Sequence, residues 1–224
     1  GNNDSNNFVI RATGSNDILT VGASSGNVGI GTASPEEQLT ITKNFRLSPT
    51  THENLNGIIY KDGNRFIHDF NYGYSGSTTT VGQNTFIGIN AGNLTMGEGV
   101  ISPFQASYNV GVGASAFTSN TSGNYNTAVG ASSLYSNTSS DNNTALGYYA
   151  LYNNKAGSNN VAVGIRAGNL VSAGSALTKP TNSIFLGAET KAQLDDQTNQ
   201  IVIGVNAIGA GSNSVVLGNT SITK

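Results

Sequence analysis

The sequence contains no cysteine and no tryptophan, and its 224 residues include only two histidines and one methionine. Without cysteine, neither a disulfide framework nor a cysteine-built metal site is possible. No run of about 18 apolar residues occurs, so the sequence predicts no membrane-spanning helix.

Charge is equally scarce. Lysine and arginine number 10 and aspartate and glutamate 12, which gives a net charge of −2. The basic residues are scattered, so the sequence predicts no basic stripe for nucleic-acid phosphates. The hydrophobic fraction of 37% is low for a compact core. It is sufficient for a solenoid, in which each layer buries only a few apolar side chains.

An internal repeat dominates the middle of the chain. Four similar segments follow one another: 109–113 (NVGVG), 126–130 (NTAVG), 143–147 (NTALG) and 160–164 (NVAVG). Their closing glycines are spaced by 17 residues, and Phe117, Leu134 and Leu151 each follow their glycine by four. A fixed period of this length is typical of a solenoid.

Looser copies extend the repeat on both sides. They are 84–88 (NTFIG), 183–187 (SIFLG), 200–204 (QIVIG) and 214–218 (SVVLG). The spacing widens between Gly88 and Gly113 and between Gly164 and Gly187. The wider gaps predict insertions at the corners of otherwise regular coils.

Each unit has the pattern of a short strand followed by a turn. Alternate residues of a strand face opposite sides, so the large aliphatic residue before each glycine shares one face along the stack. We predict that these residues fill the interior of the coil: Val112, Val129, Leu146, Val163, Leu186, Ile203 and Leu217. Leu134 and Leu151 are expected to begin a second strand.

A single coil has too little to bury. Residues 126–142 offer Val129, Leu134 and Tyr135 as large apolar groups. Their burial cannot offset the conformational entropy lost in ordering the coil. Stacking and association with other chains are therefore expected.

The NTAVG and SVVLG segments resemble the repeats in the heads of trimeric autotransporter adhesins of the YadA type and in phage tail fibres. The resemblance covers about 84–224. It implies an all-β fold: a left-handed parallel β-roll, or solenoid, in each chain of a homotrimer.

Two earlier segments resemble other parts of such fibres. Residues 26–35 (GNVGIGTASP) with 37–41 (EQLTI) resemble a short trimeric β shaft module, and residues 57–70 resemble a connector. The resulting domain organisation is a shaft module at 1–45, a connector at 46–83 and β-roll repeats at 84–224.

Catalytic and metal-binding patterns are weak. Glu36–Glu37 and Asp195–Asp196 are adjacent pairs, whose members point to opposite faces of a strand rather than across a groove, so solvated loop charges are expected. His52 and His68 are too few for a metal site within one chain, although a trimer axis could collect three copies of one histidine. We expect no enzyme activity, no cofactor and no metal.

Recognition is expected where the repeat is interrupted. The candidate binding residues are His68, Phe70, Tyr72 and Tyr74 in the connector, and Met96 and Phe104 in the insertion 92–107. Aromatic faces beside amides suit sugars. The same aromatics could instead plug the trimer where shaft meets roll. A third irregular place is 168–181.

The sequence thus favours a segment of a trimeric fibre, extracellular on a bacterial surface or a phage virion, which binds a cell-surface glycan or protein receptor. A purely structural spacer and, more remotely, a polysaccharide-degrading tailspike fragment are the alternatives. A threonine ladder for ice binding is disfavoured because valine occupies positions 110 and 161.

Overall fold

The computed structural model describes residues 8–11, 17–22, 26–30, 32, 34, 36–41, 45–51, 53, 55–75 and 78–221. The chain forms two units, 1–47 and 48–224. The described residues are all-β and contain no helix. Residues 48–83, which the sequence assigned to a connector, belong to the same unit as the repeats.

The first unit is a four-stranded sheet. Its strands are β1 (Phe8–Arg11), β2 (Asp17–Val21), β3 (Val28–Ile30) and β4 (Leu39–Ile41), in that order. The pairs β1–β2 and β2–β3 are antiparallel, and β3–β4 is parallel. Among its described residues no hydrophobic side chain is buried, and Leu39 and Phe45 are exposed. The described side chains of this sheet therefore form no hydrophobic core.

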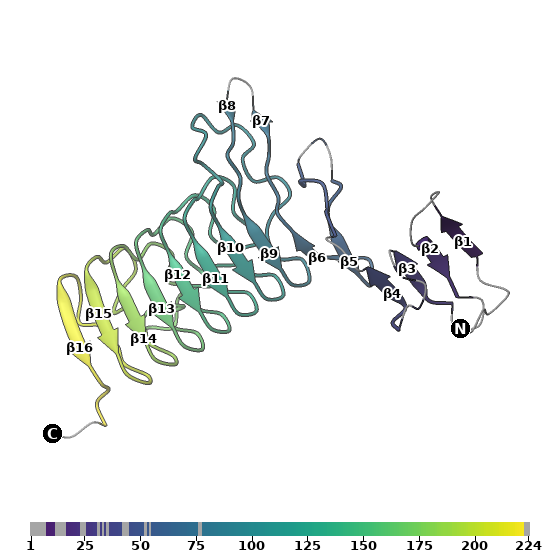
Figure 1. Ribbon diagram of the computed structural model, residues 1–224. Coiled ribbons are helices and arrows are strands. Elements are labelled where there is room, and N and C mark those ends of the chain that lie inside the picture. Colours follow the sequence, from purple (N-terminus) through teal and green to yellow (C-terminus); the bar gives the residue numbers. More distant parts are fainter. Residues whose placement is uncertain are drawn as a thin grey trace. The chain divides into compact units, whose positions relative to one another are not determined.

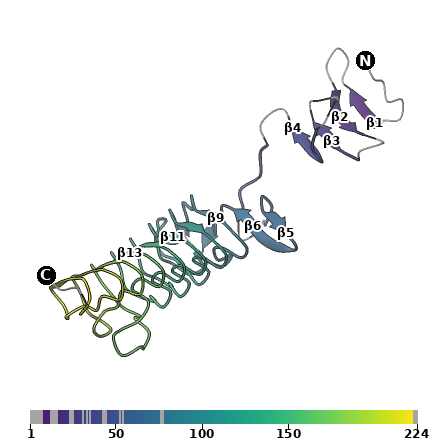
Figure 2. The same cartoon turned by 90° about the horizontal axis from the view of Figure 1, so that it is seen from below.

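The second unit is a β-solenoid in which successive coils each add one short strand to a parallel sheet (Figures 1 and 2). The strands are β9 (Thr85–Ile87), β10 (Val110–Val112), β11 (Thr127–Val129), β12 (Thr144–Leu146), β13 (Val161–Val163), β14 (Ile184–Leu186), β15 (Gln200–Ile203) and β16 (Ser214–Leu217). Equivalent repeat positions pair directly, as Ala128 with Ala145 shows. The solenoid predicted from the repeat is confirmed.

A hairpin covers the N-terminal end of this sheet. Strand β5 (Ile59–Lys61) pairs with β6 (Asn64–His68), and β6 pairs antiparallel with β9. Because β6 is antiparallel, the parallel stack ends here. Strand β6 also occupies the edge of β9, which would otherwise be free to pair with another chain. A second hairpin, β7 (Tyr74–Ser75) with β8 (Thr78–Thr79), projects beside the first coils (Figure 1).

The prediction of which strand residues face inward is wrong. The aliphatic residue before each glycine points out of the coil: none of Val112, Val129, Leu146, Val163, Leu186, Ile203 and Leu217 is buried. Val129 and Leu146 are 37% and 38% exposed, and Leu217 is 72% exposed. The fully buried residues are the middle ones of the strands, such as Ala128, Ala145 and Ala162.

The reason for the inverted facing is the narrowness of the coil. Leu134 and Leu151 reach the interior from the opposite wall and are fully buried, so only an alanine-sized side chain fits against them from the strand. Where the strand carries a phenylalanine instead, the facing residue shrinks. A Cβ added to Gly168 would lie 2.8 Å from the ring of Phe185. Large and small residues therefore complement each other across each coil.

Leu134 and Leu151 do not begin a second strand. Both lie in turns and have left-handed backbones, with φ of 47° and 48°. The turn aims each side chain into the coil, so the residue that looked like strand continuation is a corner residue. Each regular coil contributes a single short strand, and the rest is a succession of turns.

Asparagines form a ladder inside the solenoid. The first residue of each repeat points inward beside the alanine column, and Asn109, Asn126, Asn143 and Asn160 are all fully buried. Each side-chain Oδ1 accepts the backbone N–H of the next rung, as Asn126 Oδ1 does from Asn143 N at 3.0 Å. Each Nδ2 donates to a carbonyl of the neighbouring turn, such as Gly157 O for Asn143 at 2.9 Å. The repeat keeps asparagine because one side chain satisfies both backbone groups.

The closing glycines are fixed by contact with the next coil. Gly130 has φ of +126°, and a Cβ there would lie 2.5 Å from the carbonyl oxygen of Gly147. Any side chain would separate the coils at this corner.

Candidate functional site

The outer face of the solenoid sheet is an extended apolar surface. It consists of the two outward columns of strand residues: Thr85, Val110, Thr127, Thr144, Val161, Ile184, Ile201 and Val215, and Ile87, Val112, Val129, Leu146, Val163, Leu186, Ile203 and Leu217. No member is charged, and all but the threonines are aliphatic. The parallel register places equivalent residues directly above one another. The sequence predicted these columns but assigned the second to the interior.

The extent of the outer face can be worked out from strand geometry. Eight strands about 4.8 Å apart span roughly 34 Å. Two outward residues per strand make the face about 10 Å wide, hence on the order of 350 Å². This area is comparable to the largest apolar patch on a typical monomeric protein, and such patches are often functional.

The connector and the insertion 92–107 lie together, as the sequence predicted. The backbone N–H of Val81 donates to Pro103 O at 2.8 Å, and that of Gly82 donates to Ser107 Oγ at 2.9 Å. Gly97 lies so close to Tyr72 that an added Cβ would be 2.7 Å from the tyrosine Cβ.

Three of the predicted binding residues are part of the core. His68, Phe70 and Met96 are buried, and Phe70 and Met96 pack within the central hydrophobic cluster. Their side chains are therefore not accessible to a receptor, and the prediction is wrong for them. Aromatic residues in the connector fill the capped end of the solenoid, because the first coils have no preceding coil to cover them.

His68 illustrates this structural role. Its Nε2 donates to the carbonyl of Ala91 at 2.9 Å, and its ring packs on Phe86 with centroids 5.0 Å apart. Burial lowers the pKa of His68. The hydrogen bond to Ala91 opposes this shift, and the nearby Arg65 charge adds to it. The histidine is thus held neutral at the cap.

The other three predicted binding residues are less enclosed or lie partly outside the description. Tyr72 is partly buried against the core, and Phe104 is half exposed. The strand residue Tyr74 is described, but its side chain lies outside the described part, as does His52. Ile101, three residues before Phe104, is 88% exposed. The insertion therefore presents two apolar side chains to solvent, and a binding role for this loop stays a prediction.

Sequence analysis missed a cluster of tyrosines from two consecutive coils, which we call the tyrosine platform: Tyr135, Tyr148, Tyr149 and Tyr152. Tyr152 stacks on Tyr135 at 5.0 Å and on Tyr149 at 4.4 Å between ring centroids. Tyr148 lies against Tyr149 at 4.2 Å with the rings tilted by 51°. A side-chain hydrogen bond with Tyr149 raises the pKa of Tyr148, and burial raises that of Tyr152. The signal was available, since positions 135 and 152 are one 17-residue period apart.

Asp195, one member of the adjacent pair Asp195–Asp196, is held by hydrogen bonds to the irregular segment 168–181. Asp195 accepts the backbone N–H groups of Thr178 and Lys179 at 2.8 and 2.9 Å and the Thr178 hydroxyl at 2.5 Å. Burial acts to raise the pKa of Asp195, but these hydrogen bonds prevail and lower it. Asp195 therefore orders the third insertion. Among the described residues, no group of three or more His, Cys, Asp or Glu could hold a metal ion.

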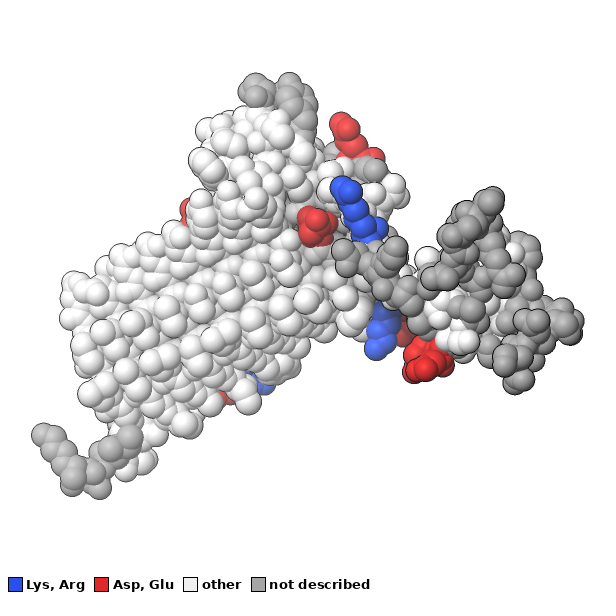
Figure 3. Space-filling model, viewed as in Figure 1, with Lys and Arg blue, Asp and Glu red and all other residues white. Residues whose placement is uncertain are grey.

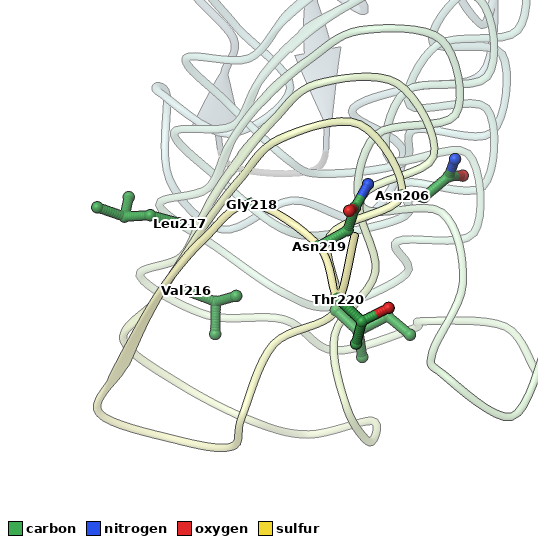
Figure 4. A pocket seen from close by; sticks show the side chains of 7 residues that line it. Asn206, Val216, Leu217, Gly218, Asn219 and Thr220 are labelled. Carbon is green, nitrogen blue, oxygen red and sulfur yellow. The ribbon is translucent and has the colours of Figure 1, made fainter. Parts of the chain in front are cut away.

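A pocket of about 310 Å³ lies at the C-terminal end of the solenoid (Figure 4). It is lined by Asn206, Ile208, Val216, Leu217, Gly218, Asn219 and Thr220. It lies beside β16, which pairs within the described residues only with β15. The lining carries no charged group.

The surface around these features is nearly free of charge. Figure 3 shows the visible side of the solenoid with few coloured residues, and no charged residue occurs between Glu98 and Asp141. Recognition on this surface must therefore depend on apolar contact and neutral hydrogen bonds.

Within the described part of the chain, no helix has the length and apolarity needed to cross a membrane. Comparison with protein-family models, with curated proteins and with solved structures found nothing that matches this chain.

Proposed function

We propose that this chain is a segment of a homotrimeric extracellular fibre whose subunits pack through the outer face of the solenoid sheet. The observation that carries the proposal is the uncharged apolar outer face, which runs along the whole parallel sheet from β9 to β16. An apolar face of this size is often an interaction surface. Buried against copies of itself, it would add to the apolar burial that the interior of each coil supplies.

Closed rotational symmetry suits this face. A flat strip parallel to the solenoid axis can meet two copies around a common axis, so that all three chains run in the same direction and no strip remains open. The side chains before the glycines would then meet near the axis. The left-handed trimeric roll implied by the resemblance to YadA-type heads and phage tail fibres has this arrangement.

The first unit supports the same proposal. Its four-stranded sheet buries no hydrophobic side chain among the described residues, yet Ile30, Leu39 and Phe45 are exposed. Two further copies would supply the cover that the sheet needs. This is the behaviour expected of a trimeric shaft module.

Adhesion to a cell-surface glycan or protein is the role we propose for the fibre. The loop cluster formed by the connector and the insertion supports it, because Ile101 and Phe104 are exposed on an insertion that the coil pattern does not require. Such loops are where a rigid scaffold carries recognition. A structural spacer without a receptor is the second candidate, favoured by the uniformity of the coils from 109 to 164.

The test is the molar mass of the purified chain by light scattering. We expect about 69 kDa, three times the 23.0 kDa of one chain. Val129→Asp places three carboxylates together at the axis, so this variant should be a folded monomer with an unchanged β-type circular dichroism spectrum. The matched control is Ala173→Asp, an equal charge change at an exposed loop residue. A folded monomer for the parent chain, or a trimeric Val129→Asp variant, would refute the proposed interface.

A further inference from the structure

We propose that the tyrosine platform (Tyr135, Tyr148, Tyr149 and Tyr152) is a binding site for a neutral carbohydrate. The inference deepens the adhesive function and rests on it, since it names the class of ligand and the place where the ligand binds. The platform lies in regular coils, away from the insertions.

The coils do not need these tyrosines. One period earlier, Tyr148 and Tyr149 are replaced by Ala131 and Ser132. The backbone is the same in both coils, because Ser132 and Tyr149 have φ of 54° and 59°. The same column holds a small residue in one coil and a large ring in the next, so packing does not explain the ring.

A comparable argument applies to the stacked pair. The column that holds Tyr135 and Tyr152 has Thr118 in the coil before them and Asn169 in the coil after them. The coil spacing places the rings of Tyr135 and Tyr152 5.0 Å apart with planes only 11° from parallel. The solenoid thus sets the stacking distance, and within this column only these two coils make use of it.

The geometry gives one open ring on a rigid base. Tyr148 is 45% exposed, and the other three tyrosines are half-buried. Tyr152 holds Tyr135 and Tyr149 through near-parallel stacking, at 11° and 14°. A pyranose can lay its C–H face on an open aromatic ring while neighbouring phenol hydroxyls bind its hydroxyls. Tyrosines provide such contacts at a low entropic cost, because few of their torsions must be fixed.

The charge around the platform favours a neutral ligand. No charged residue occurs between Asp141 and Lys155, the stretch that carries three of the four tyrosines. The Arg166 guanidinium is close enough to act on Tyr148 electrostatically. This positive charge disfavours a quaternary ammonium ion, the other ligand that aromatic clusters commonly take. Arg166 also pairs with Glu189 at 3.0 Å, and this carboxylate offsets the attraction of the guanidinium for an acidic sugar.

The platform remains accessible if the outer face is occupied. Arg166 lies one 17-residue period after Tyr149, so both side chains belong to the same column. The ion pair of Arg166 with Glu189 is exposed, with half of the arginine side chain open to solvent. A column that carries a solvated ion pair is not part of an apolar interface. A carbohydrate can therefore reach Tyr149 on the assembled fibre.

The experiment is saturation-transfer difference NMR on the full chain with three neutral probes, cellohexaose, maltohexaose and laminarihexaose, and with hexagalacturonate as the acidic comparison. We expect at least one neutral probe to bind and the acidic one not to. The double variant Tyr148→Ala/Tyr149→Ser, which copies the preceding coil, should weaken binding by about tenfold or more. The control Tyr125→Asn removes the exposed member of the separate Tyr108–Tyr125 stack and copies Asn142, and it should leave binding within about twofold.

The results that overturn the proposal are distinct. Absence of binding by every neutral probe at about 10 mM would overturn it, as would equal binding by the parent and the double variant. Cell binding that needs Tyr148 and Tyr149 but survives enzymatic removal of surface glycans would identify a protein partner instead. In each case a molar mass of about 69 kDa leaves the fibre proposal standing, because the proposed trimer interface is the outer face of the sheet, which contains no tyrosine.

Discussion

Replacing one rung of the asparagine ladder tests how the solenoid is held together. In Asn143→Ala, the carbonyl of Gly157 keeps a second donor, and Asn126 Oδ1 keeps the backbone N–H of residue 143. The Asn160 side chain still donates to Pro180 O at 2.7 Å. Only the backbone N–H of Asn160, which donated to Asn143 Oδ1 at 3.1 Å, is left buried without an acceptor.

The expected cost follows from this inventory. One orphaned buried donor costs about 1–3 kcal/mol, and the loss of the other Asn143 hydrogen bonds, whose partners keep another donor or acceptor, adds about 1 kcal/mol in total. We therefore expect Asn143→Ala to lower the free energy of unfolding by about 2–4 kcal/mol. For a unit of this size that corresponds to a fall in the thermal midpoint of about 4–16 °C.

The assay is thermal unfolding followed by circular dichroism at one protein concentration, since association also raises the midpoint. Asn143→Ser should lose roughly half as much, because a serine hydroxyl can accept the same backbone N–H, as Ser183 Oγ does from Gln200 at 3.2 Å. Asn124→Ala, at a partly exposed asparagine, is the control. If the alanine and serine variants at position 143 both have the same thermal midpoint as the control, the asparagine ladder does not stabilise the solenoid.

Four further predictions concern the interior and the titrations of His68 and Asp195. Ala128→Asp should prevent folding, because it buries a charge without a partner, and a folded chain by circular dichroism would contradict the assigned facing. Gly168→Ala should unfold at a lower temperature, since its Cβ meets the Phe185 ring at 2.8 Å, and combining it with Phe185→Ala should recover part of the loss. The pKa of His68 is lower in the folded chain than in the unfolded chain. As the pH drops below about 6.5, the unfolded chain therefore binds a proton that the folded chain does not, and the free energy of unfolding should fall. His68→Gln should flatten this pH dependence, which urea unfolding at several pH values measures. The pKa of Asp195 is lowered from its ordinary value of 3.8, so the ionised carboxylate stabilises the fold above that pH, and this stability is lost as the pH falls below 3.8. Asp195→Asn should remove this acid-dependent loss. An unchanged pH profile of stability would count against the hydrogen bonds of Asp195.

Periodicity was enough to predict the solenoid and the register of its strands. The spacing of Gly113, Gly130, Gly147 and Gly164 predicted which residues stack, and the paired strands follow it residue by residue. The long spacings also predicted the insertions, and the one at 92–107 packs on the connector. The repeat period alone decides which residues stack on one another, and the period can be read directly from the sequence.

The direction of the side chains needed more than periodicity. Alternation divides Asn126 and Ala128 from Thr127 and Val129, but it does not say which pair faces inward. Hydrophobicity favoured the valine, whereas the structure buries the asparagine and the alanine. The missing consideration was the opposite wall: Leu134 already fills the coil, so the strand can contribute only a small residue there. The connector was misread for a similar reason, because its aromatic residues belong to the capped end of the core.

The inverted facing changes what the repeat is for. If the valine and leucine columns were interior, each chain could be a self-sufficient solenoid and its outside could vary freely. With Ala128, Ala145 and Ala162 inside, the interior of these coils is limited to small residues, leucines and an asparagine ladder, while the larger aliphatic residues are retained on the outside. In the proposed trimer, the strip that carries Val112, Val129, Leu146 and Val163 is covered by a partner. Since the strip repeats with the coil, a partner with the same period matches it along its whole length, and another copy of this chain has that period.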